Sequence, residues 1–225
     1  MKNTITYYFL VFILFCTLSN TYAQRNDAAI WESITLEKRI TPKTLVHFQQ
    51  AARFGQNITS IKRTHYDLGL TFKINKNFST SLDYRFITRF FTENGTSLRH
   101  RIQWNLILKK KINPFVFIYR HRMQGQLKDF YSSEDGKTPS YYSRSKITVK
   151  YEFNKLSPYI AGELYTKIIN WNTLQSNRYR VFGGFDYQLN KMNELNLYYL
   201  FERRFNKYNP LTNYVIGIGF THRFY

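Results

Sequence analysis

The sequence predicts an all-β protein: an antiparallel transmembrane β-barrel of about ten strands, with twelve as the alternative, preceded by a cleaved signal peptide. Three observations lead to this prediction. Polar and apolar side chains alternate with a two-residue period through most of the 225 residues, an apolar leader stands at the N-terminus, and short and long connections alternate between the strand candidates. We expect a single barrel domain over residues 24–225, after a leader at residues 1–23.

The alternation is clearest in residues 178–205, which divide into two halves at a polar turn between Asn190 and Asn193. Successive side chains of a strand point to opposite faces of the sheet. One face carries Tyr179, Val181, Phe185, Tyr187 and Leu189, then Leu195, Leu197, Tyr199, Phe201 and Phe205, while the other holds Arg, Asp and Glu. Strands that are apolar towards lipid and polar towards a lumen build transmembrane barrels, so this segment predicts a barrel hairpin.

The first 23 residues form a secretory leader. Lys2 supplies the positive start, Ile5 to Leu18 the apolar stretch, and Thr21-Tyr22-Ala23 the small residues before a cut at Gln24. The chain's one cysteine, Cys16, belongs to this leader, so the mature protein has no disulfide or thiol chemistry.

The formal net charge of the chain is +19, and aromatic residues make up 19 % of it. A basic excess can indicate nucleic acid, an anionic membrane surface or an acidic ligand as the partner. Export argues against nucleic acid, and the alternation favours basic groups that face a lumen and anionic lipid head groups. The many tyrosines suit aromatic girdles at the membrane interfaces.

Nine further strand candidates flank this hairpin in the sequence. They are residues 28–40, 45–54, 65–74, 78–91, 98–112, 115–122, 144–153, 159–168 and 214–225. Short turns near 41–43, 75–77, 112–114, 154–157 and 190–193 alternate with mostly longer loops near 55–63, 92–97, 125–140, 171–177 and 206–212. This is the outer-membrane pattern, with the short turns on the periplasmic side. Because single-chain bacterial barrels use an even number of strands, we expect ten membrane strands from Leu45 onward, with residues 28–40 as a partner or terminal segment.

Several short motifs are similar to those of the outer-membrane family designated domain of unknown function 2490. They are Trp31, Arg99-His100-Arg101, Arg120-His121-Arg122, Ser157-Pro158-Tyr159, Arg178-Tyr179-Arg180 and Tyr198-Tyr199. The resemblance spans essentially the whole mature chain. It implies an outer-membrane barrel but no reaction and no functional residues. The last segment, which ends in an aromatic, resembles the signal that barrel assembly machinery reads, although His222 interrupts its apolar face.

Catalytic chemistry has weak support in the sequence. Of the five histidines (His47, His65, His100, His121 and His222), His100 with Ser97 or His121 with Ser143 could form a nucleophile–base pair. No third orienting group accompanies either pair, and no metal-ligand spacing, calcium loop or phosphate-binding glycine loop is present. We expect no enzyme activity and no cofactor, with a lipid hydrolase or acyltransferase that uses a rim His/Ser pair as the alternative.

The most informative polar residues are the charged side chains expected to face the lumen. They are Asp67, Asp83, Arg85, Arg99, Arg101, Arg120, Arg122, Arg144, Glu152, Glu163, Lys167, Arg180, Asp186, Glu202 and Arg204. They could form a charge-paired plug, because a small barrel is little wider than its side chains, or line a narrow pore or ligand cavity that favours anions.

We therefore expect a structural or small-pore protein of the outer membrane of a Gram-negative bacterium. Its partners would be outer-membrane lipids, lipopolysaccharide and, during biogenesis, the barrel assembly machinery, with no nucleic acid. A soluble periplasmic β-barrel binding protein, with its apolar face turned inward, is the rival class.

Overall fold

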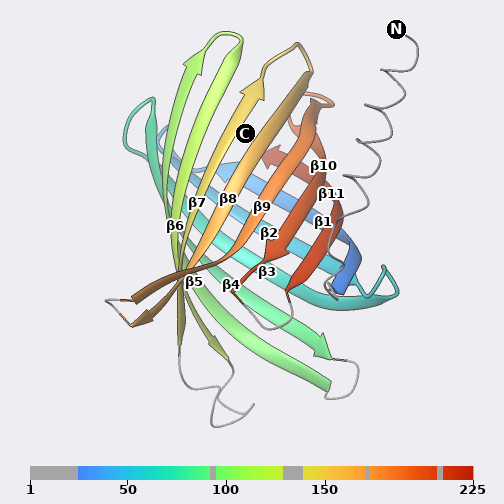
Figure 1. Cartoon of the computed structure of the whole chain (residues 1–225). Coiled ribbons are helices and arrows are strands. Elements are labelled where there is room, and N and C mark those ends of the chain that lie inside the picture. The colour runs from blue at the N-terminus through green and yellow to red at the C-terminus, as the bar shows by residue number, and fades with distance from the viewer. Residues whose placement is uncertain (1–24, 92–94, 129–138, 171–172, 207–209, 225) are drawn as a thin grey trace, which may run out of the picture.

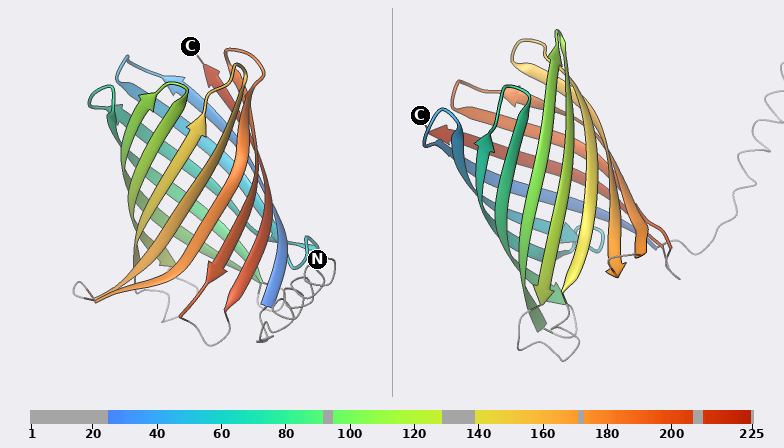
Figure 2. Two further views of the ribbon diagram at one scale, coloured as in Figure 1. Left: turned by 45° about the horizontal axis from the view of Figure 1, so that its top comes forward. Right: turned by 90° about the vertical axis from the view of Figure 1, so that its left-hand side faces the viewer.

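The two-residue alternation runs through eleven strands, which close into one barrel (Figures 1 and 2). The structure is a computed structural model that describes residues 25–91, 95–128, 139–170, 173–206 and 210–224. The predicted leader at residues 1–23 lies outside these residues. None of the residues described belongs to a helix long and apolar enough to cross a membrane. The closed barrel of eleven strands confirms the expectation of an all-β barrel.

The strands follow the chain in order around the barrel. They are β1 (Arg25–Arg39), β2 (Thr44–Gly55), β3 (Ser60–Lys73), β4 (Phe78–Phe91), β5 (Gly95–Ile112), β6 (Phe115–Lys128), β7 (Ser140–Tyr151), β8 (Leu156–Asn170), β9 (Thr173–Gln188), β10 (Asn193–Arg204) and β11 (Leu211–Phe224). Every pair of sequence neighbours is antiparallel. We call the end where odd-numbered strands finish the turn end and the opposite end the loop end.

The strands extend further towards the loop end than the sequence suggested. The loop expected at 55–63 shrinks to 56–59, because β2 continues to Gly55 and β3 begins at Ser60. Similarly, β9 begins at Thr173, inside the loop expected at 171–177. These segments are rich in polar residues on both faces, which hides the alternation but does not prevent backbone pairing. Residues such as Arg63 are therefore placed on the barrel wall.

The expected count of ten membrane strands is wrong. Residue 25 opens a full strand, β1, that pairs with β2 on one side and with β11 on the other (Figure 1). The register with β11 is parallel and runs from Arg25 opposite Leu211 to Lys38 opposite Phe224. An even number follows only when the closing pair is antiparallel. A chain that alternates direction closes an odd number of strands with one parallel pair.

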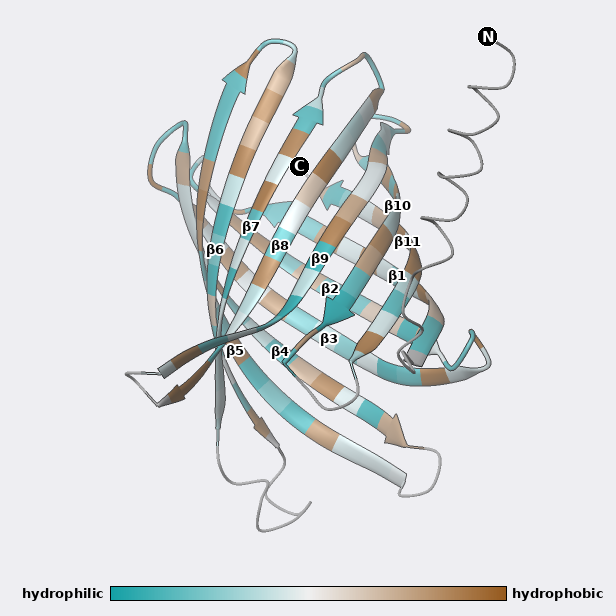
Figure 3. Ribbon diagram, viewed as in Figure 1, coloured by the Kyte–Doolittle hydropathy of each residue, from teal (hydrophilic) through white to brown (hydrophobic). Residues whose placement is uncertain are grey.

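Hydropathy alternates along the strands, as the colours of Figure 3 show, and the exposed side chains of the barrel are largely apolar while most of the buried ones are polar. On the outside, Ile160 is 67 % exposed and Ile102 is 61 % exposed. On the inside, Gln103 and Glu202 are each only 1 % exposed. A soluble β-barrel would turn its apolar side chains inward. The faces assigned from the sequence therefore agree with the structure.

A small apolar cluster fills the lumen beside β1 and β8 to β11. Its buried members are Ala29, Ala161, Phe182, Leu200 and Val215, with Trp31, Tyr159 and Tyr198 packed against them. Tyr198 lies over Gly217, where an added Cβ would stand 1.9 Å from the Tyr198 Cζ atom. Only glycine leaves room for this ring. The apolar cluster occupies part of the lumen beside these strands, and polar side chains of β9 and β10, among them Arg178, Arg180 and Arg204, line the cavity that remains.

Candidate functional site

A cavity of about 690 Å³ lies inside the barrel. Within the described part of the chain its wall carries twelve arginines, against the acidic residues Glu37, Asp67 and Asp83. The arginines are Arg53, Arg63, Arg85, Arg89, Arg99, Arg101, Arg120, Arg122, Arg144, Arg178, Arg180 and Arg204. A space lined in this way by one sign of charge attracts ions of the opposite sign. The cavity is the candidate site.

The cavity extends along the barrel axis. Leu45 and Thr221, which belong to the turn-end parts of β2 and β11, line it together with Arg89 and Arg204, which belong to the loop-end parts of β4 and β10. The polar space therefore approaches both ends of the barrel.

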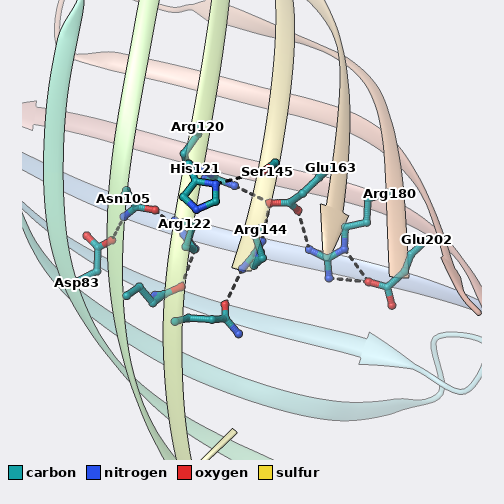
Figure 4. A network of polar contacts seen from close by, with 12 residues as sticks. Asp83, Asn105, Arg120, His121, Arg122, Arg144, Ser145, Glu163, Arg180 and Glu202 are labelled. Carbon is teal, nitrogen blue, oxygen red and sulfur yellow. Dashed lines mark hydrogen bonds and ion pairs between the residues drawn. The ribbon is translucent and has the colours of Figure 1, made fainter. Parts of the chain in front are cut away.

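Half of these arginines are held by buried carboxylates. Glu163 Oε1 accepts hydrogen bonds from Arg120 and Arg144, each at 2.8 Å (Figure 4). Glu202 Oε2 accepts one from Arg180 Nε at 2.6 Å and pairs with Arg178 at 3.5 Å. These two carboxylates form a continuous charged network along β6 to β10, because Arg180 Nη1 also lies 3.5 Å from Glu163 Oε2.

The Tyr165 ring lies within this network. It is 5 % exposed, and the guanidinium carbons of Arg144, Arg178 and Arg180 lie 4.2, 4.8 and 4.7 Å from its centroid. An aromatic face attracts cations through its negative quadrupole. Tyr165 thus helps to hold three like charges close together without adding a negative charge.

A second polar network joins β3, β4, β5 and β6. Arg85 pairs with Asp67 through two hydrogen bonds. Asn105 donates to Asp83 at 2.5 Å and accepts from Arg122 Nε at 2.5 Å (Figure 4). Arg122 thus meets an amide oxygen rather than a carboxylate. Among the described residues, Arg53, Arg63, Arg89, Arg99 and Arg101 also have no carboxylate within ion-pair distance.

A family model described as "Protein of unknown function (DUF2490)" matches residues 28–213. The chain belongs to the DUF2490 family. No curated protein matches it. A solved structure described as "Bacterial polysaccharide outer membrane secretin" is similar at 8 % identity, with a TM-score of 0.45, and the match covers 79 % of this chain and 74 % of that one.

In this DUF2490 barrel most of the side chains expected to face the lumen do line the cavity. These are Asp67, Asp83, Arg85, Arg99, Arg101, Arg120, Arg122, Arg144, Arg180 and Arg204. Glu163 and Glu202 are buried among those arginines, and Asp186 pairs with Lys150. Lys167 is an even number of residues from the lumen-facing Glu163 on β8, but it does not line the cavity. Glu152 departs from the expectation, since β7 ends at Tyr151 and Glu152 pairs with the partly exposed Lys111 beyond it.

Sequence reasoning missed four arginines of the cavity: Arg53, Arg63, Arg89 and Arg178. Arg53, Arg89 and Arg178 alternate in step with the polar residues of segments that the sequence identifies as strands. The two-residue alternation alone could therefore have placed them in the lumen. The sequence predicts a loop at Arg63. Only the longer β3 of the structure brings it to the lumen.

The structure separates the side chains of one candidate nucleophile–base pair and brings together those of the other. Ser97 lies two residues before Arg99 on β5 and so faces the lumen with it. His100 faces outward, and its Nδ1 atom lies 2.6 Å from the Tyr84 hydroxyl. Ser97 and His100 therefore point to opposite faces of their strand. His121 faces outward on β6, with Nε2 3.5 Å from Ser143 Oγ and Nδ1 3.2 Å from Ser145 Oγ. These contacts bring together the second pair.

Two further features bear on chemistry in this DUF2490 barrel. The backbone N–H groups beside Ser143 belong to paired strands and serve the sheet. They therefore offer no set of free donors for an oxyanion. Across the ranges that the structure describes, no group of three or more His, Cys, Asp or Glu side chains could hold a metal ion.

Proposed function

We propose that this DUF2490 protein is an outer-membrane barrel that passes small anions through its basic lumen and catalyses no reaction. The observation that carries the proposal is the arginine-lined cavity, which reaches towards both ends of the barrel. Fixed positive charges along a narrow path lower the energy of an anion and raise that of a cation. The pairing of half the arginines with carboxylates keeps the wall ordered while the cavity remains strongly basic.

The apolar character of the outer face is evidence that lipid surrounds the barrel. Exposed Leu, Ile and aromatic side chains cover it, among them Leu68, Leu82, Ile102, Ile147 and Ile160. An apolar surface of this extent is unfavourable in water and favourable in hydrocarbon. The apolar outer face and polar interior also argue against the rival of a soluble periplasmic binding protein. Outer-membrane lipids and lipopolysaccharide would be the surrounding partners, and the barrel assembly machinery would insert the chain.

Membrane fractionation and planar-bilayer recording test this function. We expect the protein to stay with the membrane in carbonate, to migrate differently on a gel before and after heating, and to conduct chloride in preference to potassium. Arg101→Glu, inside the cavity, should shift the selectivity towards potassium. The control Lys110→Glu makes the same change of charge on the outer face of the same strand and should leave selectivity unchanged. Release by carbonate, or cation preference in the parent protein, would contradict the proposal.

A further inference from the structure

Three arginines stand directly opposite one another on neighbouring strands of the cavity wall. Arg53 of β2 is the register partner of Arg63 of β3, and Arg63 is the partner of Arg89 of β4. All three line the cavity. Directly opposite residues on antiparallel strands have Cα atoms about 4.5–5.5 Å apart. Like charges in these positions destabilise a sheet. We call these residues the arginine row.

Carboxylates do not offset this charge in the described part of the chain. Arg53 lies over the Trp31 ring, with its guanidinium carbon 3.5 Å from the centroid, and Arg89 lies 5.3 Å from the centroid of Phe91. These ring contacts orient the guanidinium groups but do not neutralise them. By contrast, Arg85, which is four residues before Arg89 on the same strand, is paired with the carboxylate of Asp67. The row is a concentration of positive charge that the barrel leaves available to the cavity.

We propose that the arginine row binds the phosphate group of a small solute. A guanidinium presents parallel N–H donors that match two phosphate oxygens, and it binds phosphate more specifically than a lysine does. A doubly charged tetrahedral anion can accept from several guanidinium groups at once and relieve their mutual repulsion. Chloride, with one charge, relieves it less. This inference rests on the proposed function only in that the cavity is reached from solution.

The volume and the position of the cavity favour a free solute over a lipid head group as the source of the phosphate. Its volume of about 690 Å³ is within the usual range for small-molecule sites. The row faces this interior space, whereas lipid would contact the opposite face of the same strands. A phosphorylated sugar or inorganic phosphate suits this space, whereas the acyl chains of a lipid would lie against its charged and polar wall.

The chemistry of the row also sets the charge state of its ligand. Arginine only donates hydrogen bonds, so the row offers no acceptor for a proton on the phosphate. The site should therefore prefer the dianion, which for a phosphate monoester forms above a second pKa of about 6. Phosphate should bind more tightly at pH 7.5 than at pH 5.5.

Calorimetric titration of the purified full-length protein in detergent, with chloride as the background anion, tests the site. Inorganic phosphate should bind saturably to the parent protein and at least tenfold more weakly to Arg63→Gln. Arg203→Gln is the matched control. It removes the same charge from the outer face of β10, between the inward-facing Glu202 and Arg204, and should bind as the parent does. The urea midpoint without phosphate checks folding: Arg63→Gln should be at least as stable as the parent, because a like charge is removed.

Short-chain phosphatidic acid distinguishes the two sources of phosphate. Binding of this lipid that Arg63→Gln abolishes would support the row and assign its phosphate to a head group. Absence of saturable binding of either ligand, or equal binding by the parent and Arg63→Gln, would overturn the site. The titration does not depend on conductance. An anion-selective current without phosphate binding would therefore reject the phosphate site and support the pore. Phosphate binding without a current would support the site and reject the pore.

Discussion

Arg180 Nε donates a hydrogen bond to Glu202 Oε2 at 2.6 Å, and this contact joins β9 to β10 inside the barrel. Glu202 is 1 % exposed and also accepts from Asn213 at 2.8 Å, so that β11 belongs to the same network. Without this carboxylate, two further arginines beside it, Arg178 and Arg204, would lose a counter-charge as well. The order of the lumen wall thus depends strongly on one acidic residue.

Glu202→Gln should destabilise the barrel by about 3–5 kcal/mol, because removing one partner leaves buried charges uncompensated. The measurement is the urea midpoint in lipid vesicles. Glu152→Gln is the control. Its ion pair with Lys111 lies at the partly exposed turn end, where such pairs contribute about 1 kcal/mol or less. Similar midpoints for the two variants would contradict the network as a source of stability.

The same exposed pair gives the barrel a small dependence on acid. The hydrogen bond from Lys111 lowers the pKa of Glu152 below its usual value. A carboxylate whose pKa is lowered by folding stabilises the folded state above its unfolded pKa of about 4.3, and this contribution disappears as the pH falls through the folded value. Between pH 5 and pH 3, the stability of the parent should therefore fall more steeply than that of Lys111→Met. Parallel urea midpoints over that range would be evidence against the coupling.

Ile102 tests whether the outer face contacts lipid. It is 61 % exposed near the middle of β5. In a membrane, Ile102→Arg should cost about 2–4 kcal/mol. In water an exposed position tolerates arginine, and the change would be within about 0.5 kcal/mol. The urea midpoint in vesicles gives the answer, with Ile102→Ala as the control for the lost side chain. If the arginine variant is no less stable than the alanine variant, the lipid assignment fails.

His121 and Ser143 provide the test of catalysis. Although they lie 3.5 Å apart on the outer face, the strands around them supply no set of free backbone donors. We expect the purified protein to leave phospholipid and lipopolysaccharide acyl chains intact, with or without calcium. His121→Ala should give the same background as the parent in a fatty-acid release assay. Release by the parent that His121→Ala abolishes would reverse this conclusion.

The faces of the strands could be predicted from the sequence because parity is a local property. Leu200 and Glu202 share a parity, and both are buried on the inner side of β10. The arginine row could be predicted only in part. Arg53 and Arg89 stood on recognised polar faces, but Lys62 and Arg63 are consecutive charged residues that break the alternation. Strand and loop look alike at such a point, and the pairing of the backbone decides between them.

The strand count could not be predicted because closure is not a local property. Whether residues 25–39 form a wall strand depends on a partner nearly 190 positions away in sequence, and no periodicity within the segment reports this pairing. The even-number rule favoured ten strands. The rule describes barrels that close through an antiparallel pair, and a parallel closing pair removes its premise.

Cysteine cross-linking tests the parallel closure directly. Ile34 of β1 and Phe220 of β11 are register partners on the outer face. The chain's one cysteine is Cys16, in the predicted leader, so introduced pairs react without competition after its removal. Ile34→Cys with Phe220→Cys should form a disulfide in high yield under mild oxidation, because neighbouring strands lie about 4.7–4.9 Å apart, which is within the Cα separation that a disulfide spans.

Phe48→Cys with Phe220→Cys is the matched control. Phe48 lies on β2 with its side chain on the same outer face, but β1 separates it from β11. The two strands are therefore about two strand spacings apart, close to 10 Å, which is beyond the reach of a disulfide. A ten-stranded barrel would place β2 next to β11 and leave β1 outside the wall. Cross-linking of the control pair, together with failure of the first pair, would restore the ten-stranded arrangement; the reverse pattern requires β1 in the wall.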